Sequence, residues 1–325
     1  MNYFKNELPE GSKIIASDMQ ISAPSMADAD IAVVAKSIYH PEYVQDIIDT
    51  CNKYSVDVVI SLNDLELPIL ARHKNDIKEK TGAKVIVPSE EVIDICFDKI
   101  KTVEFAKNLN IQTPLTFLSA ESFKSANAAG DIEFPVVVKP RWGSASIGLE
   151  FPEEMREFEL SFEMINIKLD RTILSEVSSA DRDSAIMIQQ KIAGREYGLD
   201  IVNDLEGNHV GVIVKEKLSM RSGETDKAVT VNNSEISAIG KLIGENLGHV
   251  GNLDCDIMEE NGQYYLIEMN PRFGGGYPFS HEAGANVPKA ILSWLEGAPS
   301  SDKFLEVSFH SAFSKCDRLV GIRPE

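Results

Sequence analysis

Cysteine is scarce in this sequence, and its few copies are not spaced for disulfide or metal chemistry. Cys51, Cys96, Cys255 and Cys316 lie far apart among 325 residues, and no Cys-x-x-Cys pair occurs. Structural zinc sites usually need such pairs, and disulfide frameworks belong to short secreted chains. The spacing therefore argues against both and is typical of reduced thiols in a cytosolic protein.

Positive charge and long apolar runs are also lacking. Lys and Arg number 32 against 51 Asp and Glu, so the formal net charge is −19. Because binding to a phosphate backbone needs clustered Lys and Arg, we expect no nucleic-acid partner. No apolar run approaches the roughly 20 residues of a membrane span, and residues 1–11 lack the pattern of a signal peptide. We therefore expect a cytoplasmic protein with no membrane partner.

The first hundred residues alternate apolar runs with helical periods. Two helices are predicted. One covers residues 41–54 and begins with Pro41 at a plausible first helical position, and the other covers residues 64–82 and is disturbed at Pro68. The runs that read as buried parallel strands are residues 13–18, 31–37, 56–64 and 84–89. This alternation predicts an α/β domain with a mostly parallel sheet.

The start of the chain does not fit a complete doubly wound domain. Such a domain opens with a strand and a glycine-rich turn, whereas residues 2–8 read as a short helix. Either a first strand is missing ahead of this start, or the sheet is one strand short. We expect a parallel sheet that lacks its first strand.

The pattern changes beyond the first hundred residues. Ser89 is expected to cap a helix, and residues 98–111 form a second amphipathic period. Antiparallel strands separated by glycine-rich turns are then predicted at residues 134–140, 184–192, 196–204 and 209–220. A helix over 234–248 precedes two strands within 254–270. The last 25 residues give no clear assignment.

The two strands within 254–270 are joined at Asn261-Gly262, a strong hairpin signal, and the loop length decides which side chains share a face. A two-residue loop would place Glu268 opposite Cys255 and separate the acids. A three-residue loop would place Asp256 opposite Glu268, and Asp254 opposite Asn270. We expect the three-residue loop, with Gly262 supplying the positive φ.

Four polar groups gathered on one face would be destabilising without a cation among them. Carboxylate and carboxamide oxygens suit Mg²⁺ or Mn²⁺, with water and phosphate oxygens completing the shell. The alternative is a solvated polar face on an edge hairpin, which the cluster alone does not exclude.

A second region has the composition of a phosphate-binding turn. A predicted strand ends at Lys139 and is followed by Gly143, Ser144, Ser146 and Gly148. Such a turn lets backbone N–H groups approach phosphate oxygens, and the lysine adds charge. The segment is not a Walker A sequence, and a flexible loop explains it better than phosphate binding when it is taken alone.

Taken in order, five segments resemble the ATP-grasp superfamily, in the branch that includes the carbamoyl-phosphate synthase large subunit and biotin carboxylase. They are Asp98-Lys99, VVVKP at 136–140, GSASIG at 143–148, QQKIAGREYGLD at 189–200 and a D–x11–E–x–N–P–R hairpin at 256–272. Residues 1–98 also resemble the α/β domain that precedes the ATP-grasp fold in these proteins. Five spaced segments are far more specific than any one of them.

The resemblance implies a fold and a division of the chain. An α/β pre-ATP-grasp domain with a parallel sheet should occupy residues 1–98 and be followed by a two-subdomain α+β ATP-grasp fold. The small subdomain would cover residues 99–183, and the subdomain with the metal site would cover residues 184–325.

The resemblance also implies a site that binds ATP with Mg²⁺ or Mn²⁺. Arg272 would steady the transferring phosphoryl group, and Asp256, Glu268 and Asn270 would hold the metal, with Asp254 behind them. The residues implied for ATP are Lys99, Lys139, Gly143, Ser144, Ser146, Gln189, Gln190, Ile192 and Glu196, of which Gln190 and Ile192 would offer backbone groups to adenine. Gln189 stands where relatives often carry glutamate.

Weaker signals concern the substrates. The segment 215–231 resembles a substrate-side loop, but solvated surface charge explains its charged residues equally well. Asn63 and Asp64 follow a strand's carboxyl end, where α/β sheets bind ligands, and helix capping explains them almost as well. The weaker substrate candidates are Asp254, Lys215, Arg221, Glu224, Lys227, Gly275, Asn63 and Asp64.

The activity implied is an ADP-forming ligase that joins a small-molecule carboxylate to an amine through an acyl phosphate. A homodimer is compatible with this. Synthesis of carbamoyl phosphate is disfavoured because the large subunit of carbamoyl-phosphate synthase carries two ATP-grasp halves, whereas this chain has room for one. Biotin carboxylase is disfavoured because the chain ends about 50 residues after Arg272. A catalytically silent ATP-binding regulator and a nucleotide-dependent oxidoreductase are the other readings, but the metal ligands and the arginine are all present and no GxGxxG occurs.

Overall fold

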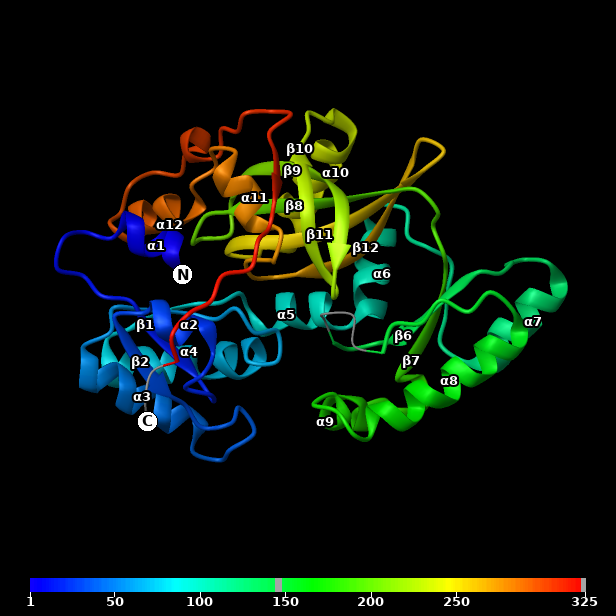
Figure 1. Ribbon diagram of the computed structural model, residues 1–325, viewed down its shortest axis with the longest axis horizontal. Coiled ribbons are helices and arrows are strands. Elements are labelled where there is room, and N and C mark those ends of the chain that lie inside the picture. The colour runs from blue at the N-terminus through cyan, green and yellow to red at the C-terminus, as the bar shows by residue number, and fades with distance from the viewer. Residues whose placement is uncertain (144–147, 323–325) are drawn as a thin grey trace.

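The structure is a computed structural model that describes residues 1–143 and 148–322. Figure 1 shows a mixed α/β architecture in which the N-terminal region, a small three-stranded sheet and a six-stranded antiparallel sheet surround a common centre. The predicted fold class, a parallel N-terminal region followed by an antiparallel α+β fold, is confirmed. In the described part of the chain, no helix combines the length and apolarity that a membrane crossing requires.

The N-terminal region contains two separate pairs of parallel strands, β1 with β2 and β3 with β4. Its elements are α1 (Asn2–Glu7), β1 (Ile15–Asp18), α2 (Pro24–Asp28), β2 (Ile31–Val34), α3 (Tyr43–Tyr54), β3 (Val58–Ile60), α4 (Leu67–Thr81), β4 (Lys84–Ile86) and α5 (Glu90–Phe97). The four predicted strands are present but shorter than expected. Helix α1 packs against α12 (Val287–Leu295), and its Tyr3 stacks on His281 of α11 (Tyr277–Glu282) with ring centroids 3.7 Å apart.

The helix boundaries follow local signals, with one correction. Gly82 ends α4 at φ 79° in the left-handed region, and the Ser89 hydroxyl accepts a hydrogen bond from Val92 N at 3.3 Å and caps α5. The prediction that Pro68 disturbs α4 was wrong. The helix begins at Leu67, so Pro68 lies in its first turn, where no backbone N–H is needed.

The small sheet has the strand order β5-β7-β6 and is covered by two helices that the sequence did not indicate. Phe123 of α7 and Phe158 of α8 are fully buried in its core, with ring centroids 4.5 Å apart. The elements are α6 (Lys99–Asn108), β5 (Thr116–Phe117), α7 (Ala120–Ala129), β6 (Val136–Pro140), α8 (Met155–Leu169), α9 (Ser175–Ser178), the 3-10 helix η1 (Ser179–Ser184) and β7 (Ile186–Gln190). Helix α6 itself contacts strand β12 of the large sheet.

The large antiparallel sheet has the strand order β12-β11-β8-β9-β10-β13. Its elements are β8 (Arg195–Asn203), β9 (His209–Arg221), β10 (Glu224–Thr230), α10 (Ser234–Leu247), β11 (Gly251–Glu260), β12 (Gln263–Asn270), α11 (Tyr277–Glu282), α12, the 3-10 helix η2 (Asp302–Phe304) and β13 (Ala312–Ser314). Residues 215–231, predicted as a substrate-side loop, instead form most of the β9–β10 hairpin. The strand predicted at 209–220 is confirmed as β9, whereas β10 was not predicted.

The two faces of the large sheet have opposite character, as the period of a strand requires. Leu199, Leu253 and Cys255 point to one face and are fully buried beneath α5, α6 and α10. On the other face, apolar residues such as Val202 and Ile213 pack under α12 at one end only. Charged residues occupy the rest of that face. The site described below lies there.

The β11–β12 hairpin corrects one prediction and keeps its consequence. The loop has two residues, Asn261 and Gly262, with φ of 53° and 78°, so the predicted three-residue loop was wrong. A bulge next to Asp256 shifts the register by one residue, because Asp256 pairs with Glu268 while Ile257 pairs with Leu266. The acids therefore face each other as predicted.

A buried histidine gives the fold a testable pH dependence. His249 is fully buried, its Nε2 donates to the Ile201 carbonyl oxygen at 3.0 Å, and burial lowers its pKa to about 4. The unfolded chain, with an ordinary histidine pKa of about 6.5, binds the proton more readily. This contribution to stability is complete above pH 6.5 and is lost as the pH falls toward 4, and the loss reaches about 2 kcal/mol at pH 5.

Urea denaturation at pH 7, 6 and 5 should show this loss in the wild type and not in a His249→Gln variant. A variant of the exposed histidine, His40→Gln, serves as the control and should keep the wild-type slope. Parallel slopes for the wild type and His249→Gln would contradict the assignment.

Candidate active site

The three predicted metal ligands come from the two strands of one hairpin. Asp256 on β11 faces Glu268 on β12, and Asn270 lies one pleat further along β12, on the same face. Asn270 Nδ2 lies 3.4 Å from Glu268 Oε1. The structure therefore brings these side chains together as the sequence predicted. Asp254 faces Asn270 on the same side of the sheet.

Lys217 balances this acidic group, and sequence reasoning had not singled it out. Its Nζ lies 2.6 Å from Asp256 Oδ1 and 2.8 Å from Glu196 Oε1. The side chain is only 8% exposed, so its charge acts with little screening by water. Lys217 lies two residues beyond Lys215 on β9, so the two share a face, and it lies opposite Glu196 on β8. This pattern was the signal that could have identified it.

The side-chain oxygens of Asp256, Glu268 and Asn270 are the candidate ligands of a divalent cation. Burial and the neighbouring carboxylates raise the pKa of Asp256 against the charge of Lys217. Asp256 Oδ1 is buried and pairs with Lys217 Nζ by charge, but among the described residues no contact that it makes has hydrogen-bond geometry. No three Asp, Glu, His or Cys side chains in residues 1–143 and 148–322 converge as a metal cluster. Two carboxylates and one carboxamide nevertheless fit Mg²⁺, which keeps several waters and phosphate oxygens.

Two buried lysines face the same carboxylates from outside the large sheet. Lys99 begins α6 and Lys139 lies on β6, and they are 7% and 8% exposed. Burial and the charge of Lys99 lower the pKa of Lys139 to about 8, although Glu268 and Asp256 oppose this. Burial alone would raise the pKa of Glu268, but the nearby lysines outweigh it and hold that pKa below its ordinary value.

The glycine-rich segment begins beside these lysines. Lys99 Nζ donates a hydrogen bond to the Gly143 carbonyl oxygen. Gly143 has a φ of 117°, and a Cβ there would lie 2.9 Å from Leu174 Cδ1, so only glycine fits. Ser144 and Ser146 lie outside the described residues.

Arg141 is a further charged group that the sequence analysis overlooked. Its guanidinium donates to both oxygens of Asp98, at 2.6 and 2.7 Å, and stacks over Trp142. Asp98 also accepts from Ile100 N at 3.0 Å and caps α6. This bidentate pair therefore fixes the helix start that carries Lys99.

The predicted adenine-side residues lie on β7 and just beyond it. Gln189 is buried, and its Nε2 donates to Thr116 Oγ1 at 2.9 Å. Gln190 N donates to the Leu115 carbonyl oxygen at 2.8 Å, so this N–H is already bonded within the small sheet. Ile192 is buried at the connection from β7 to β8.

Arg272 joins the N-terminal region to the large sheet. Its Nη2 donates to Asp64 Oδ2 at 2.7 Å, and its Nη1 lies 3.5 Å from Asp254 Oδ2. Asp64 follows β3, so the two regions meet at this guanidinium. Gly274 supports the arrangement, because a Cβ there would lie 2.0 Å from Asp254 Cγ. A side chain at position 274 would displace Asp254.

The weaker candidates divide into three groups. Lys215 is fully buried and pairs with Asp200, whose Oδ1 also accepts from Asn252 Nδ2 at 3.0 Å, so it belongs to the interior. Asn63 is exposed and accepts from Leu65 N at 3.1 Å, as a turn cap does. Lys227 is exposed on β10. Arg221, Glu224 and Gly275 border a separate pocket, described below.

Family comparison agrees with this geometry. Residues 96–276, more than half of the chain, match the ATP-grasp domain family. The chain belongs to the ATP-grasp family. Residues 1–86 match the PylC-like N-terminal domain family. The carbamoyl phosphate synthase large chain of Clostridium botulinum (strain Alaska E43 / Type E3) is 25% identical over 294 residues, which cover 86% of this chain and 26% of that protein. The ATP-grasp chain thus spans about a quarter of the length of the curated relatives it matches.

Solved structures share the ATP-grasp fold at low sequence identity. Biotin carboxylase from Campylobacter jejuni, solved as a β-γ-ATP complex, superposes with a TM-score of 0.71 at 20% identity, covering 96% of this chain and 71% of that one. An L-amino acid ligase from Bacillus licheniformis gives a TM-score of 0.66 at 16% identity, covering 93% and 79%. These likenesses establish the fold.

Proposed function

We propose that this ATP-grasp protein is an ATP- and Mg²⁺-dependent ligase that joins a small-molecule carboxylate to an amine, releasing ADP and phosphate. The observation that supports it most is that Arg272, which pairs with Asp254, and two buried lysines all act on the charge of Glu268 in the carboxylate–carboxamide set. Cations for a triphosphate and oxygen donors for a metal then lie together. The predicted domain boundaries, at 98/99 and 183/184, and the cytoplasmic location belong to the same proposal.

The proposed chemistry has two balanced steps. A carboxylate oxygen bonds to the γ-phosphorus of ATP, and the bond from that phosphorus to the β–γ bridging oxygen breaks, so an acyl phosphate and ADP form. The amine then bonds to the acyl carbon and loses a proton, and the bond from that carbon to the phosphate oxygen breaks. Phosphate leaves and an amide remains.

The side chains of this protein have positioning and electrostatic roles in that scheme. Lys99 and Lys139 would bind phosphate oxygens, and Arg272 would stabilise the charge that develops on the transferring phosphoryl group. Asp256, Glu268 and Asn270 would hold Mg²⁺, which when bound neutralises part of the triphosphate charge. Asp64 and Asp254 would orient the guanidinium.

A panel assay tests the proposal. ADP release by the full chain is measured with MgATP, first alone and then with pairs drawn from amino acids, hydroxy acids, bicarbonate, simple amines and ammonia. We expect release that requires both a carboxylate and an amine. If ATP binds, judged by a rise in melting temperature, but no pair supports release, the ligase proposal is wrong and a silent ATP-binding regulator replaces it.

Release with bicarbonate and ammonia alone would instead favour the chemistry of carbamoyl phosphate synthase. In that case the product after the first turnover is carbamate or its phosphate, which mass spectrometry distinguishes from a stable amide.

A further inference from the structure

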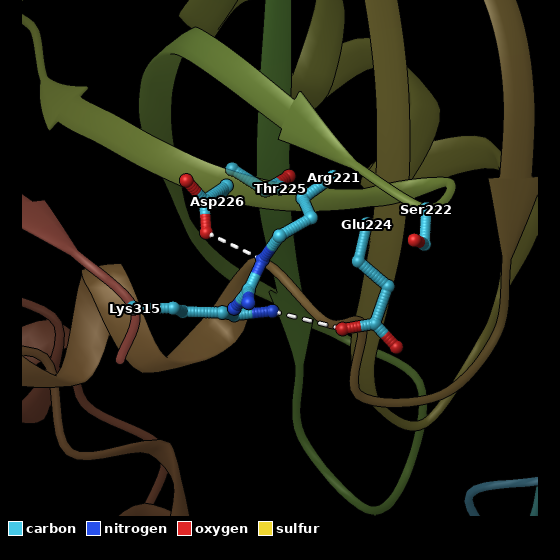
Figure 2. A pocket seen from close by; sticks show the side chains of 6 residues that line it. All are labelled: Arg221, Ser222, Glu224, Thr225, Asp226 and Lys315. Atoms are coloured by element: carbon cyan, nitrogen blue, oxygen red, sulfur yellow. Dashed lines mark hydrogen bonds and ion pairs between the residues drawn. The ribbon is translucent and has the colours of Figure 1, made fainter. Parts of the chain in front are cut away.

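A pocket of about 250 Å³ lies on the β9–β10 hairpin, beyond the candidate metal ligands Asp256, Glu268 and Asn270. It is lined by Arg221, Ser222, Glu224, Thr225, Asp226 and Lys315 (Figure 2). Arg221 ends β9, four residues beyond Lys217, and a register shift of the β9–β10 pairing lies between the two residues. The volume is below the range of roughly 300 to 1,000 Å³ found for drug-sized ligands, so the pocket suits a small metabolite.

The pocket adjoins the glycine segment that follows Arg272. A Cβ at Gly275 would lie 3.5 Å from Glu224 Oε2 and 3.7 Å from Lys315 Nζ. Gly274, the next residue back, packs against Asp254, which itself pairs with Arg272. Residues 273–275 of one loop therefore connect Arg272 to the wall of the pocket.

Two ion pairs cross the pocket, and each has one sheltered and one exposed member. Lys315 Nζ lies 3.0 Å from Glu224 Oε2, with side chains 25% and 66% exposed. Asp226 Oδ1 lies 3.0 Å from Arg221 Nε, with side chains 16% and 48% exposed. The sheltered members are thus one cation, Lys315, and one anion, Asp226. Lys315 is anchored because its backbone N donates to the Asp226 carbonyl oxygen at 2.8 Å.

This arrangement favours a ligand that carries both charges. Exposed ion pairs contribute little stability, so ligand groups can take the places of Glu224 and Arg221. Arg221 has a second partner that it keeps in such an exchange, because its Nη1 lies 2.7 Å from Asp317 Oδ2. A ligand carboxylate could replace Glu224 at Lys315 while a ligand ammonium replaces Arg221 at Asp226. A lone carboxylate would satisfy only Lys315 and leave Asp226 with its original partner. A zwitterion satisfies both sheltered charges at once.

We propose that this pocket binds an α-amino acid as one of the two substrates, with its carboxylate at Lys315 and its ammonium at Asp226. The inference rests on the proposed ligase function and names the substrate class of that site. Gly275 leaves the space open, and Thr225, which is buried, closes the floor of the pocket.

The test begins with the full chain, MgATP and a panel of the twenty standard L-amino acids, each paired with ammonia, with a simple amine or with a second amino acid. Each active amino acid is then replaced by its α-hydroxy acid and by the amine that lacks the carboxylate. One of these analogues lacks the group that reacts and only identifies that group. We expect the other analogue, which keeps the reacting group, to lower kcat/KM about 100-fold, because a site built for a polar group rejects an analogue without it. An analogue that keeps the reacting group and works as well as the amino acid would overturn the proposal and leave the ligase function intact.

Variants separate the sheltered from the exposed charges. Lys315→Met and Asp226→Asn should raise the KM for the amino acid about tenfold while the KM for ATP stays constant. Glu224→Gln should lower the amino-acid KM about threefold, because a competing carboxylate is removed. Gly275→Leu should raise the KM, because its side chain fills the pocket.

The control is Lys241→Met on α10, an exposed lysine in a similar pair with Glu245 at 3.7 Å, which should leave both KM values unchanged. Lys315→Arg keeps the charge and should recover most of the affinity that Lys315→Met loses. Where no amino acid supports ADP release, the shift in melting temperature with each amino acid, in wild type and Lys315→Met, tests the pocket separately. A shift that is equal in both proteins, or absent from both, would overturn it.

Discussion

Replacing Glu268 with glutamine should lower ADP release about 1,000-fold, the largest effect expected of any single substitution in this protein. Glu268 faces Asp256 across the hairpin, and Lys99, Lys139 and Lys217 all act on its charge. Glutamine keeps the shape of the side chain and removes the charge. The metal site then loses one of its two carboxylates, so the Mg²⁺ concentration needed for half-maximal activity should rise as well.

A readout besides activity separates a metal role from misfolding. The melting temperature of the wild type should rise when Mg²⁺ and ATP are added together, and Glu268→Gln should lose most of that rise while keeping its own melting transition. The matched control is Glu245→Gln, an exposed glutamate on α10, outside the charged face. If Glu268→Gln turns over normally, the metal assignment is wrong.

Replacing Arg272 with alanine should lower turnover about 100-fold while ATP binding is kept, because the lost interaction acts mainly on the charge of the transition state. The guanidinium is held by Asp64 at 2.7 Å and by Asp254 at 3.5 Å. It therefore needs no reorganisation when the phosphoryl group moves. Steady-state kinetics should show a lower kcat with little change in the KM for ATP.

The same substitution leaves two carboxylates without their cation, so stability must be measured beside activity. Asp64 Oδ1 already has no hydrogen-bond partner among the described residues. Arg195→Ala is the control, because Arg195, at the start of β8, pairs with Glu259 on β11 at 2.9 Å but is 61% exposed. Arg272→Lys, which keeps the charge and loses the planar fork, should fall between the wild type and alanine. Unchanged turnover in Arg272→Ala would contradict its assigned role.

Much of the candidate site could be predicted because strands repeat every two residues. Glu268 and Asn270 had to share a face once they were placed on one strand, and Asp256 followed from the pairing. The pairing itself was predicted from the wrong loop length. A bulge compensated for the shorter loop, and no residue of the hairpin signals a bulge as clearly as Asn261-Gly262 signals the turn.

Other contacts could not be predicted because they join distant segments. Asp64 and Arg272 are separated by 208 residues, and Asp98 and Arg141 by 43, so neither pair has a local pattern. Lys315 lies in the last 25 residues, which gave no assignment, yet β13 pairs with β10 and carries it to the pocket. Helix α8 was missed, although it buries Phe158 and Ile165 against the small sheet.

The most direct test of the account follows oxygen from the carboxylate to phosphate. An active carboxylate from the panel is labelled with ¹⁸O in both oxygens, and the phosphate released during turnover is examined by mass spectrometry. Activation as an acyl phosphate predicts one ¹⁸O atom in each phosphate and one in the amide. Phosphate without ¹⁸O, formed at the same rate as the amide, would show that no acyl phosphate forms and would contradict the central claim.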